Sequence, residues 1–232
     1  MRIGGRAFPT DALLSRGGVF ANLSFSGNLH MTELINHSIE FFDAQFQRQV
    51  QDGDFTLNPF EELALPYLRG RILDLGSGLG NLTVEAARRG CSVLALDAST
   101  NAIERVRSVA AAEGLPIQAT IADLTTYQIT QDFDVIVSIG LLMFLERSRA
   151  QELLCDIQQH VRPGGCAIIN VLIEGTTYLA MFEPTQYYLF GPAELQDGFA
   201  GWEILESRYH NFEAPGHTVK MFTTVVARKP SS

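Results

Sequence analysis

The stretch RILDLGSGLGN, residues 71–81, decides the fold, because a short apolar run meets an acid and then three glycines at alternate positions. Such a run predicts a buried strand that ends at Leu75, and the glycines predict the turn into a following helix. Glycine in that turn permits unusual backbone dihedral angles and close approach of a ligand to the backbone. Packing of the helix against the strand can also require glycine, so the turn alone leaves both explanations open.

Short apolar runs alternate with helical stretches from residue 71 onward. We expect strands at RILDL, SVLALD, PIQATIA, FDVIVSI and CAIINVLI, and helices over residues 81–89, 100–113 and 147–161. This alternation predicts a parallel sheet with helices on both faces. Residues 202–212 and 217–229 form two further strands, whose link is so short that they pair as a hairpin. The last strand should therefore run antiparallel to the rest.

The first part of the chain follows a different pattern. Residues 1–30 show no strong period, and a helix with one apolar stripe is expected after them. The stripe consists of Ile35, Ile39, Phe42, Phe46 and Val50. Pro59 opens another short helix. We therefore expect an N-terminal extension with a lid helix over residues 1–58 and one domain over residues 59–230.

The composition excludes several classes of protein. The chain has 232 residues, of which 46% are hydrophobic and 19% charged, as expected for a globular domain with a sizeable core. A net charge of -9 without a Lys/Arg run argues against a nucleic-acid partner. The sequence shows no secretory signal and no apolar span of about 20 residues, so we expect a cytoplasmic protein without a membrane partner. The three cysteines lack metal-ligand spacing, so we expect free thiols and no metal.

Asp74 and the glycines after it restrict the kind of ligand. In open α/β sheets, ligands bind at the carboxyl ends of the strands. The sequence reads D-x-G-x-G-x-G, whereas the dinucleotide fingerprint G-x-G-x-x-G would need a glycine where Asn81 stands, and the P-loop lysine is absent. The turn is therefore not built for pyrophosphate, and Asp74 favours a ligand with a positive group.

Two further acids follow the next strands. Asp97 ends the second strand, where a carboxylate can accept hydrogen bonds from both hydroxyls of a ribose. Capping of the next helix is the alternative for Asp97, although Ser99 or Thr100 can take that role. Asp123 could accept a hydrogen bond from an adenine amino group, with an apolar neighbour against the ring, or it could be a turn residue.

The segments LDLGSGLGN, ALDAS, ADL, FDVIVSIGLLMFL and VRPGG occur in the order and spacing of class I S-adenosylmethionine-dependent methyltransferases. From about Phe60 to its end, the chain resembles that family. The resemblance implies an α/β fold with a Rossmann-like, doubly wound, seven-stranded sheet whose last strand is antiparallel. It also implies S-adenosylmethionine as the cofactor, which has an adenosine, a methionyl amino and carboxylate group and a sulfonium, but no phosphate.

The resemblance also assigns roles to residues. It implies that Asp74 and the glycine turn bind the methionyl part, Asp97 the ribose, and Asp123 with Leu124 the adenine. Residues 138–140 would lie beneath the sulfonium. Phe42 and Phe46 could close over the cofactor, with plain core packing as the alternative. The expected cofactor-binding residues are Asp74, Gly76, Ser77, Gly78, Gly80, Asn81, Asp97, Ala98, Asp123, Leu124, Ser138, Ile139, Gly140, Phe42 and Phe46.

The second half of the chain is similar to a narrower group, the tellurite-resistance methyltransferases of the TehB type. The similar segments are LLMFLE, YYLFGPAELQDGFAGWEILESRYH and FTTVVARK. The similarity implies a small acceptor: a thiol, a metalloid oxyanion or a small metabolite. That group has arginine and histidine in the terminal hairpin, where this chain offers Arg208, His210, His217 and Lys220. His210 and His217 are the expected catalytic residues, as general base or anion contact; solvent-facing histidines are the alternative.

The sequence thus predicts a methyltransferase that acts on a small-molecule acceptor, as a monomer or homodimer. Aromatic residues before the hairpin could line the acceptor site or pack within a lid. They are Tyr178, Phe182, Tyr187, Tyr188 and Phe190. A nicotinamide-dependent oxidoreductase would need the pyrophosphate-binding turn that the sequence lacks. A non-catalytic module that binds S-adenosylmethionine remains the alternative, because the sequence contains no dedicated catalytic residue.

Overall fold

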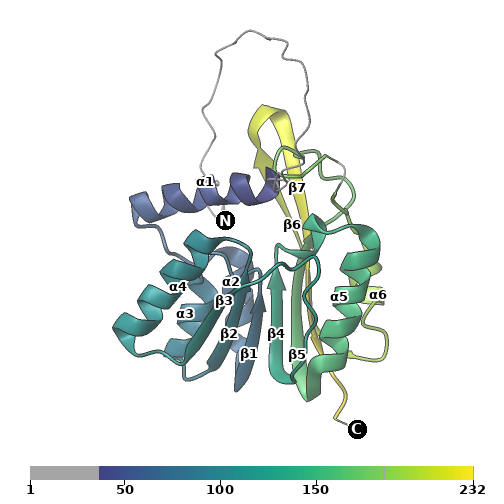
Figure 1. The fold of residues 1–232 in the computed structure, drawn as a ribbon. Coiled ribbons are helices and arrows are strands. Elements are labelled where there is room, and N and C mark those ends of the chain that lie inside the picture. Colours follow the sequence, from purple (N-terminus) through teal and green to yellow (C-terminus); the bar gives the residue numbers. More distant parts are fainter. Residues whose placement is uncertain (1–36, 185, 232) are drawn as a thin grey trace, which may run out of the picture.

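The computed structural model describes residues 37–184 and 186–231, which contain one seven-stranded sheet of order β3-β2-β1-β4-β5-β7-β6 (Figure 1). The strands are β1 (Arg71–Leu75), β2 (Ser92–Asp97), β3 (Ile117–Ile121), β4 (Phe133–Ile139), β5 (Val161–Leu172), β6 (Glu203–Ala214) and β7 (Thr218–Arg228). The first five strands pair in parallel, whereas β7 is antiparallel to both β5 and β6. The predicted fold class is therefore confirmed, including the antiparallel last strand.

Helices cover both faces of the sheet (Figure 1). They are α1 (His37–Asp52), α2 (Pro59–Ala64), α3 (Asn81–Arg88), α4 (Thr100–Glu113), α5 (Arg147–His160) and α6 (Glu194–Asp197), with short 3-10 turns η1 (Leu65–Tyr67), η2 (Leu142–Phe144) and η3 (Pro215–His217). Alternate residues of one strand serve different faces, as the period of two requires. Val93 of β2 packs with α3, whereas Leu96 of β2 packs with α5. The doubly wound arrangement follows from strands that are apolar on both sides.

The helix bounds agree closely with those expected from the sequence. One strand, β5, begins earlier than expected. Helix α1 overlaps the predicted apolar stripe, although Ile35 and the first 36 residues of the expected extension over residues 1–58 lie outside the described residues. Strand β5 begins at Val161, not after the Pro-Gly-Gly stretch as expected. Its pairing with β4 is irregular between Val161 and Cys166, which lie opposite Phe133 and Val135. Within this irregularity a Cβ at Gly165 would lie 2.6 Å from the carbonyl oxygen of Asp134, an approach that only glycine allows.

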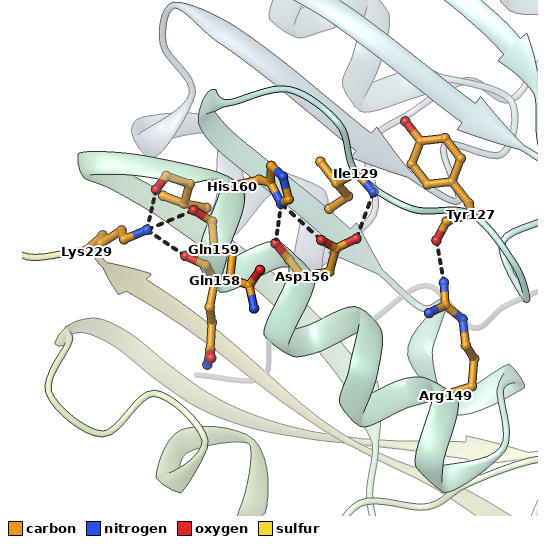
Figure 2. Close-up of polar contacts among 9 residues, drawn as sticks. Tyr127, Ile129, Arg149, Asp156, Gln158, Gln159, His160 and Lys229 are labelled. Atoms are coloured by element: carbon orange, nitrogen blue, oxygen red, sulfur yellow. Dashed lines mark hydrogen bonds and ion pairs between the residues drawn. The ribbon is translucent and has the colours of Figure 1, made fainter.

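The end of α5 is fixed by a residue that follows β7. The ammonium of Lys229 donates hydrogen bonds to the carbonyl oxygens of Gln158 (2.7 Å), Gln159 (3.1 Å) and Val161 (2.8 Å) (Figure 2). The last carbonyls of a helix have no partner within the helix and carry partial negative charge. A cation there donates hydrogen bonds to them and balances that charge. On the same helix, the Asp156 carboxylate accepts from the Ile129 backbone N–H at 2.7 Å. These contacts hold α5 against the sheet whose carboxyl edge forms the site.

Helix α1 lies across that carboxyl edge (Figure 1). Its Asp43 accepts a hydrogen bond from the Ser99 hydroxyl, and its Ser38 hydroxyl accepts from the Glu183 backbone N–H at 3.3 Å. Helix α1 is thus joined to the segments after β2 and β5. None of the helices in the described part of the chain has the length and apolar character needed to cross a bilayer.

Candidate active site

A cavity of about 360 Å³ lies at the carboxyl ends of β1, β2, β4 and β5, beneath α1. This volume falls in the range of small-molecule sites, which is about 300–1,000 Å³. Every expected cofactor-binding residue except Ser138 lines the cavity. Ser138 is fully buried, one residue before the lining residue Ile139. The structure therefore brings together residues from five segments that are distant in the sequence.

The structure shows a separate reason for glycine at two positions of the turn: helix packing at one and open space for a ligand at the other. Gly76, Gly78 and Gly80 all have positive φ, between 51° and 74°. A Cβ at Gly80 would lie 2.4 Å from Cγ2 of Val106, so this glycine allows α3 to pack closely on α4. A Cβ at Gly78 would instead project to within 3.2 Å of the Phe46 ring across the cavity. Packing thus requires Gly80, whereas Gly78 keeps the space beneath α1 open.

Asp74 is a buried carboxylate at the end of β1. Its side chain lines the cavity, with an exposed fraction of only 6%. Burial raises the pKa of Asp74 to about 6, a rise that the nearby Asp97 increases and the Thr83 hydrogen bond opposes. The Thr83 hydroxyl donates to Oδ2 at 2.5 Å. Such a carboxylate is stabilised by a cationic group in the cavity.

Asp97 connects the glycine turn to the start of α4. Its Oδ2 accepts from the Gly78 N–H at 2.8 Å and its Oδ1 from the Ser99 N–H at 2.9 Å. Burial raises the pKa of Asp97, and these hydrogen bonds oppose the rise. The N-cap of α4 is Ser99, whose hydroxyl accepts from the Ala102 N–H at 3.1 Å. Asp97 is therefore not used as the cap and faces the cavity.

Glu61 is a third carboxylate in the cavity; it is half-buried and was not predicted from the sequence. Asn58 and Glu61 form a capping box at the start of α2, in which the Glu61 Oε2 accepts from the Asn58 N–H at 2.8 Å. Burial raises the pKa of Glu61 to about 7, and the charge of Asp74 adds to the rise. The pattern N-P-F-E signals the helix start, but only the tertiary fold brings it beside Asp74. Glu61, Asp74 and Asp97 together make this end of the cavity strongly favourable for a cation.

Asp123 forms a local turn at the rim of the cavity. Its Oδ1 accepts from the Thr125 N–H at 2.9 Å and from the Thr125 hydroxyl at 2.6 Å. The Thr125 hydroxyl is the main reason why the pKa of Asp123 is lowered. The next residue, Leu124, is buried and also lines the cavity. The turn role expected as the alternative is therefore present, and it leaves an apolar and an acidic residue at the cavity.

Three buried polar atoms of lining residues have no hydrogen-bond partner among the described residues. They are Ser77 Oγ, Asn81 Oδ1 and Asn170 Oδ1. A buried polar group without a partner costs about 1–3 kcal/mol, so native proteins satisfy such groups with protein, water or ligand. Ser77 and Asn81, in the turn beside Asp74, therefore fit a ligand with both hydrogen-bond donors and a positive charge, such as the methionyl end of S-adenosylmethionine.

The other end of the cavity is mostly apolar. Its lining residues there are Phe60, Met143, Phe144, Leu172, Met181, Lys220 and Phe222. None of the five aromatic residues proposed from sequence for an acceptor wall lines the cavity. Phe182 packs on Phe144 at 4.9 Å between ring centroids and stacks on Tyr187 at 4.6 Å. The rings of Phe182 and Tyr187 therefore pack behind the residues that line the cavity.

The two histidines expected to be catalytic do not line the cavity. The His210 ring packs edge-on against Phe60, at 5.5 Å between centroids, and burial lowers its pKa. His217 lies exposed in the turn η3 with a φ of 59°. The hairpin cation that does reach the cavity is Lys220, while Arg208 pairs with Glu206 at 2.8 Å. The catalytic role of the histidines stays a prediction without support from their placement.

Comparison with known proteins agrees with this geometry. Residues 72–165 match the family described as "Methyltransferase domain". The probable S-adenosyl-L-methionine-dependent methyltransferase TehB of Haemophilus influenzae (strain 10810) is 28% identical over 166 residues, which are 68% of this chain and 57% of that protein. The chain is therefore similar in sequence to TehB-like methyltransferases. The name of this relative gives S-adenosyl-L-methionine as its cofactor.

The chain is also similar to a curated protein of another name and to a solved structure. Hemagglutinin 1 of Eikenella corrodens is 31% identical over 166 residues, which cover 69% of this chain and 55% of that protein. The chain thus spans little more than half the length of these curated relatives. The crystal structure of TehB from Haemophilus influenzae superposes with a TM-score of 0.66 at 23% identity, covering 83% of this chain and 67% of that one. This structural likeness supports the fold.

Proposed function

We propose that the chain is an S-adenosylmethionine-dependent methyltransferase that acts on a small-molecule acceptor. The observation that carries the proposal is the joint lining of one cavity by three carboxylates, Asp74 buried and Glu61 and Asp97 half-buried, and by a glycine turn without pyrophosphate features. A site that is rich in carboxylates and lacks phosphate-binding features suits a cofactor with an ammonium and a sulfonium. In this proposal, residues 59–230 form the methyltransferase domain and α1 within residues 1–58 forms its lid.

Each part of the cavity has a role in the proposal. Asp74 and the turn residues Ser77 and Gly78 hold the methionyl end, Asp97 holds the ribose, and Asp123 with Leu124 holds the adenine. When bound, S-adenosylmethionine supplies a methyl group on an activated sulfonium. Gly140 lies beside β5, because its N–H donates to the Asn170 carbonyl at 3.0 Å, and this contact fixes the floor of the cavity.

The chain contributes to such a reaction mainly by positioning the acceptor and by excluding water from the reacting atoms. Holding a nucleophile in line with the methyl group can lower the barrier by about 7–11 kcal/mol. Phe42 of α1 packs edge-on against Phe144 of η2, at 5.2 Å between centroids, and both line the cavity. This aromatic contact closes the cavity between α1 and the segment after β4, and it limits the access of water to the reacting atoms.

A binding module without catalysis is the rival from another class. It predicts an acceptor space that is blocked, whereas the cavity extends past Gly140 to Met143, Met181 and Phe222. Calorimetry with S-adenosylmethionine, followed by assay of S-adenosylhomocysteine formation with a panel of thiols, phenols and metalloid oxyanions, tests the proposal. Cofactor binding with turnover on one class supports an enzyme. Tight binding with no turnover on any class would favour the module.

A further inference from the structure

The acceptor end of the cavity has polar groups at its two extremes and an apolar centre. Strand pairing places Asn170 opposite Thr224 and Leu172 opposite Phe222. Because alternate residues of a strand share a face, Lys220 lies on that same face of β7. Lys220 and Thr224 are four positions apart, a distance of about 13 Å along the strand at about 3.3 Å per residue. An acceptor in this space therefore meets an amide at one end and an ammonium at the other.

Asn170 marks the end nearest the cofactor. Its side chain is fully buried, and its Nδ2 donates to the Thr224 hydroxyl at 2.9 Å and to the Thr223 carbonyl at 3.4 Å. A backbone carbonyl only accepts, so the NH₂ faces β7 and Oδ1 is left for the cavity, without a partner among the described residues. This oxygen requires a hydrogen-bond donor on the ligand.

Lys220 marks the other end. It is the one basic residue among those that the structure shows lining the cavity, and its ammonium lies 4.5 Å from the centre of the Tyr178 ring. Glu61, Asp74 and Asp97 make the cofactor end negative, so an anionic group on the acceptor is repelled from that end. The charge distribution of the cavity therefore orients an acidic acceptor with its anion toward Lys220.

Building on the proposed function, we propose that the acceptor is a small organic acid. Its hydroxyl, thiol or amine donates to Asn170 Oδ1, its apolar body packs against Leu172, Phe222 and the nearby methionines, and its carboxylate pairs with Lys220. The aliphatic and aromatic lining suits a body without further polar groups. Lys220 and Asn170 are then the residues that determine acceptor specificity.

Three matched probes test this without knowledge of the natural acceptor. They are 4-hydroxyphenylacetate, its neutral analogue 4-hydroxyphenylacetamide, and 4-methoxyphenylacetate, which lacks the hydroxyl donor. Binding is measured by calorimetry on the full chain saturated with S-adenosylhomocysteine, so that no turnover occurs. We expect the hydroxy acid to bind at least tenfold more tightly than the amide and at least fivefold more tightly than the methoxy acid.

Variants then assign each preference to a residue. Lys220→Met should reduce the preference for acid over amide to less than twofold, and Asn170→Leu should reduce the preference for hydroxyl over methoxy. Arg208→Met is the matched control, because Arg208 is an exposed cation of the same hairpin outside the cavity, and it should keep both preferences. The probe comparison on the unaltered chain needs no variant to fold.

The outcomes separate this inference from the proposed function. Failure of S-adenosylhomocysteine to bind the unaltered chain would reject the proposed function itself. Normal binding of S-adenosylhomocysteine, combined with an acid that binds no better than its amide or does not bind at all, would overturn the acid-acceptor inference and leave the proposed function standing. If Lys220→Met still prefers the acid over the amide, Lys220 does not determine acceptor specificity.

Discussion

Replacement of Asp74 by Asn should separate cofactor binding from stability. In the structure, Thr83 donates to one oxygen of the carboxylate, and the side chain lines the cavity. Asn can keep the Thr83 contact through its carbonyl oxygen, but it then presents an NH₂ where the methionyl ammonium should bind. The lost charged hydrogen bond is worth about 1.5–3 kcal/mol. The dissociation constant for S-adenosylmethionine should therefore rise about 10- to 150-fold, at about 1.4 kcal/mol per tenfold.

The same substitution should leave the fold intact. Burial raises the pKa of Asp74 to about 6, so the charged form is disfavoured in the ligand-free protein. Removal of that charge should offset the new buried NH₂, and the free energy of unfolding should fall by less than about 1 kcal/mol. Calorimetry and urea unfolding at pH 7.5 measure the two quantities, with Asp132→Asn, an exposed acid outside the cavity, as the control for net charge. A variant that binds the cofactor within threefold of the unaltered chain would refute the role of Asp74.

Three further changes have distinct expected results. The ligand-free chain should lose stability as the pH rises from about 4.5 to about 7, because folded Glu61 holds a proton there that the unfolded chain has released; urea unfolding at both ends should show a smaller loss for Glu61→Gln, and an equal loss would contradict the assignment. Gly80→Ala should cost about 1–3 kcal/mol more than Gly90→Ala, since both have positive φ but only Gly80 would contact Val106; equal unfolding midpoints would argue against the packing role. Asp97→Asn should lower both stability and cofactor affinity, because it must lose one of two backbone hydrogen bonds; unchanged stability in thermal unfolding would count against those contacts.

Much of the fold could be predicted from local patterns. The period of the apolar residues located the helices to within a few residues, and Ser99 and Thr100 were both recognisable as candidate caps of the helix after Asp97. The start of β5 was not predictable, because Pro163 and Gly164 signal a turn in isolation. Val161 and Cys166 both pair with β4, so the strand spans an irregularity at which Gly165 approaches the Asp134 backbone, a contact between distant segments.

The cofactor end of the site was more accessible to sequence reasoning than the acceptor end. Asp74 and Asp97 stand at strand ends, where α/β sheets bind ligands, so their positions follow from the strand pattern. The choice among the hairpin cations depends instead on register. His210 lies opposite Phe222 on the outer strand and is covered by Phe60, whereas Lys220 extends past the end of β5 to the cavity. A sequence does not show which hairpin residue another element covers.

The cavity should bind S-adenosylmethionine and not a dinucleotide. We would measure this first, by isothermal calorimetry of the full chain with S-adenosylmethionine, S-adenosylhomocysteine and NADH. We expect binding of the first two in the micromolar range and no measurable heat with NADH. A folded sample that binds neither S-adenosylmethionine nor S-adenosylhomocysteine, or that binds NADH more tightly, would contradict it.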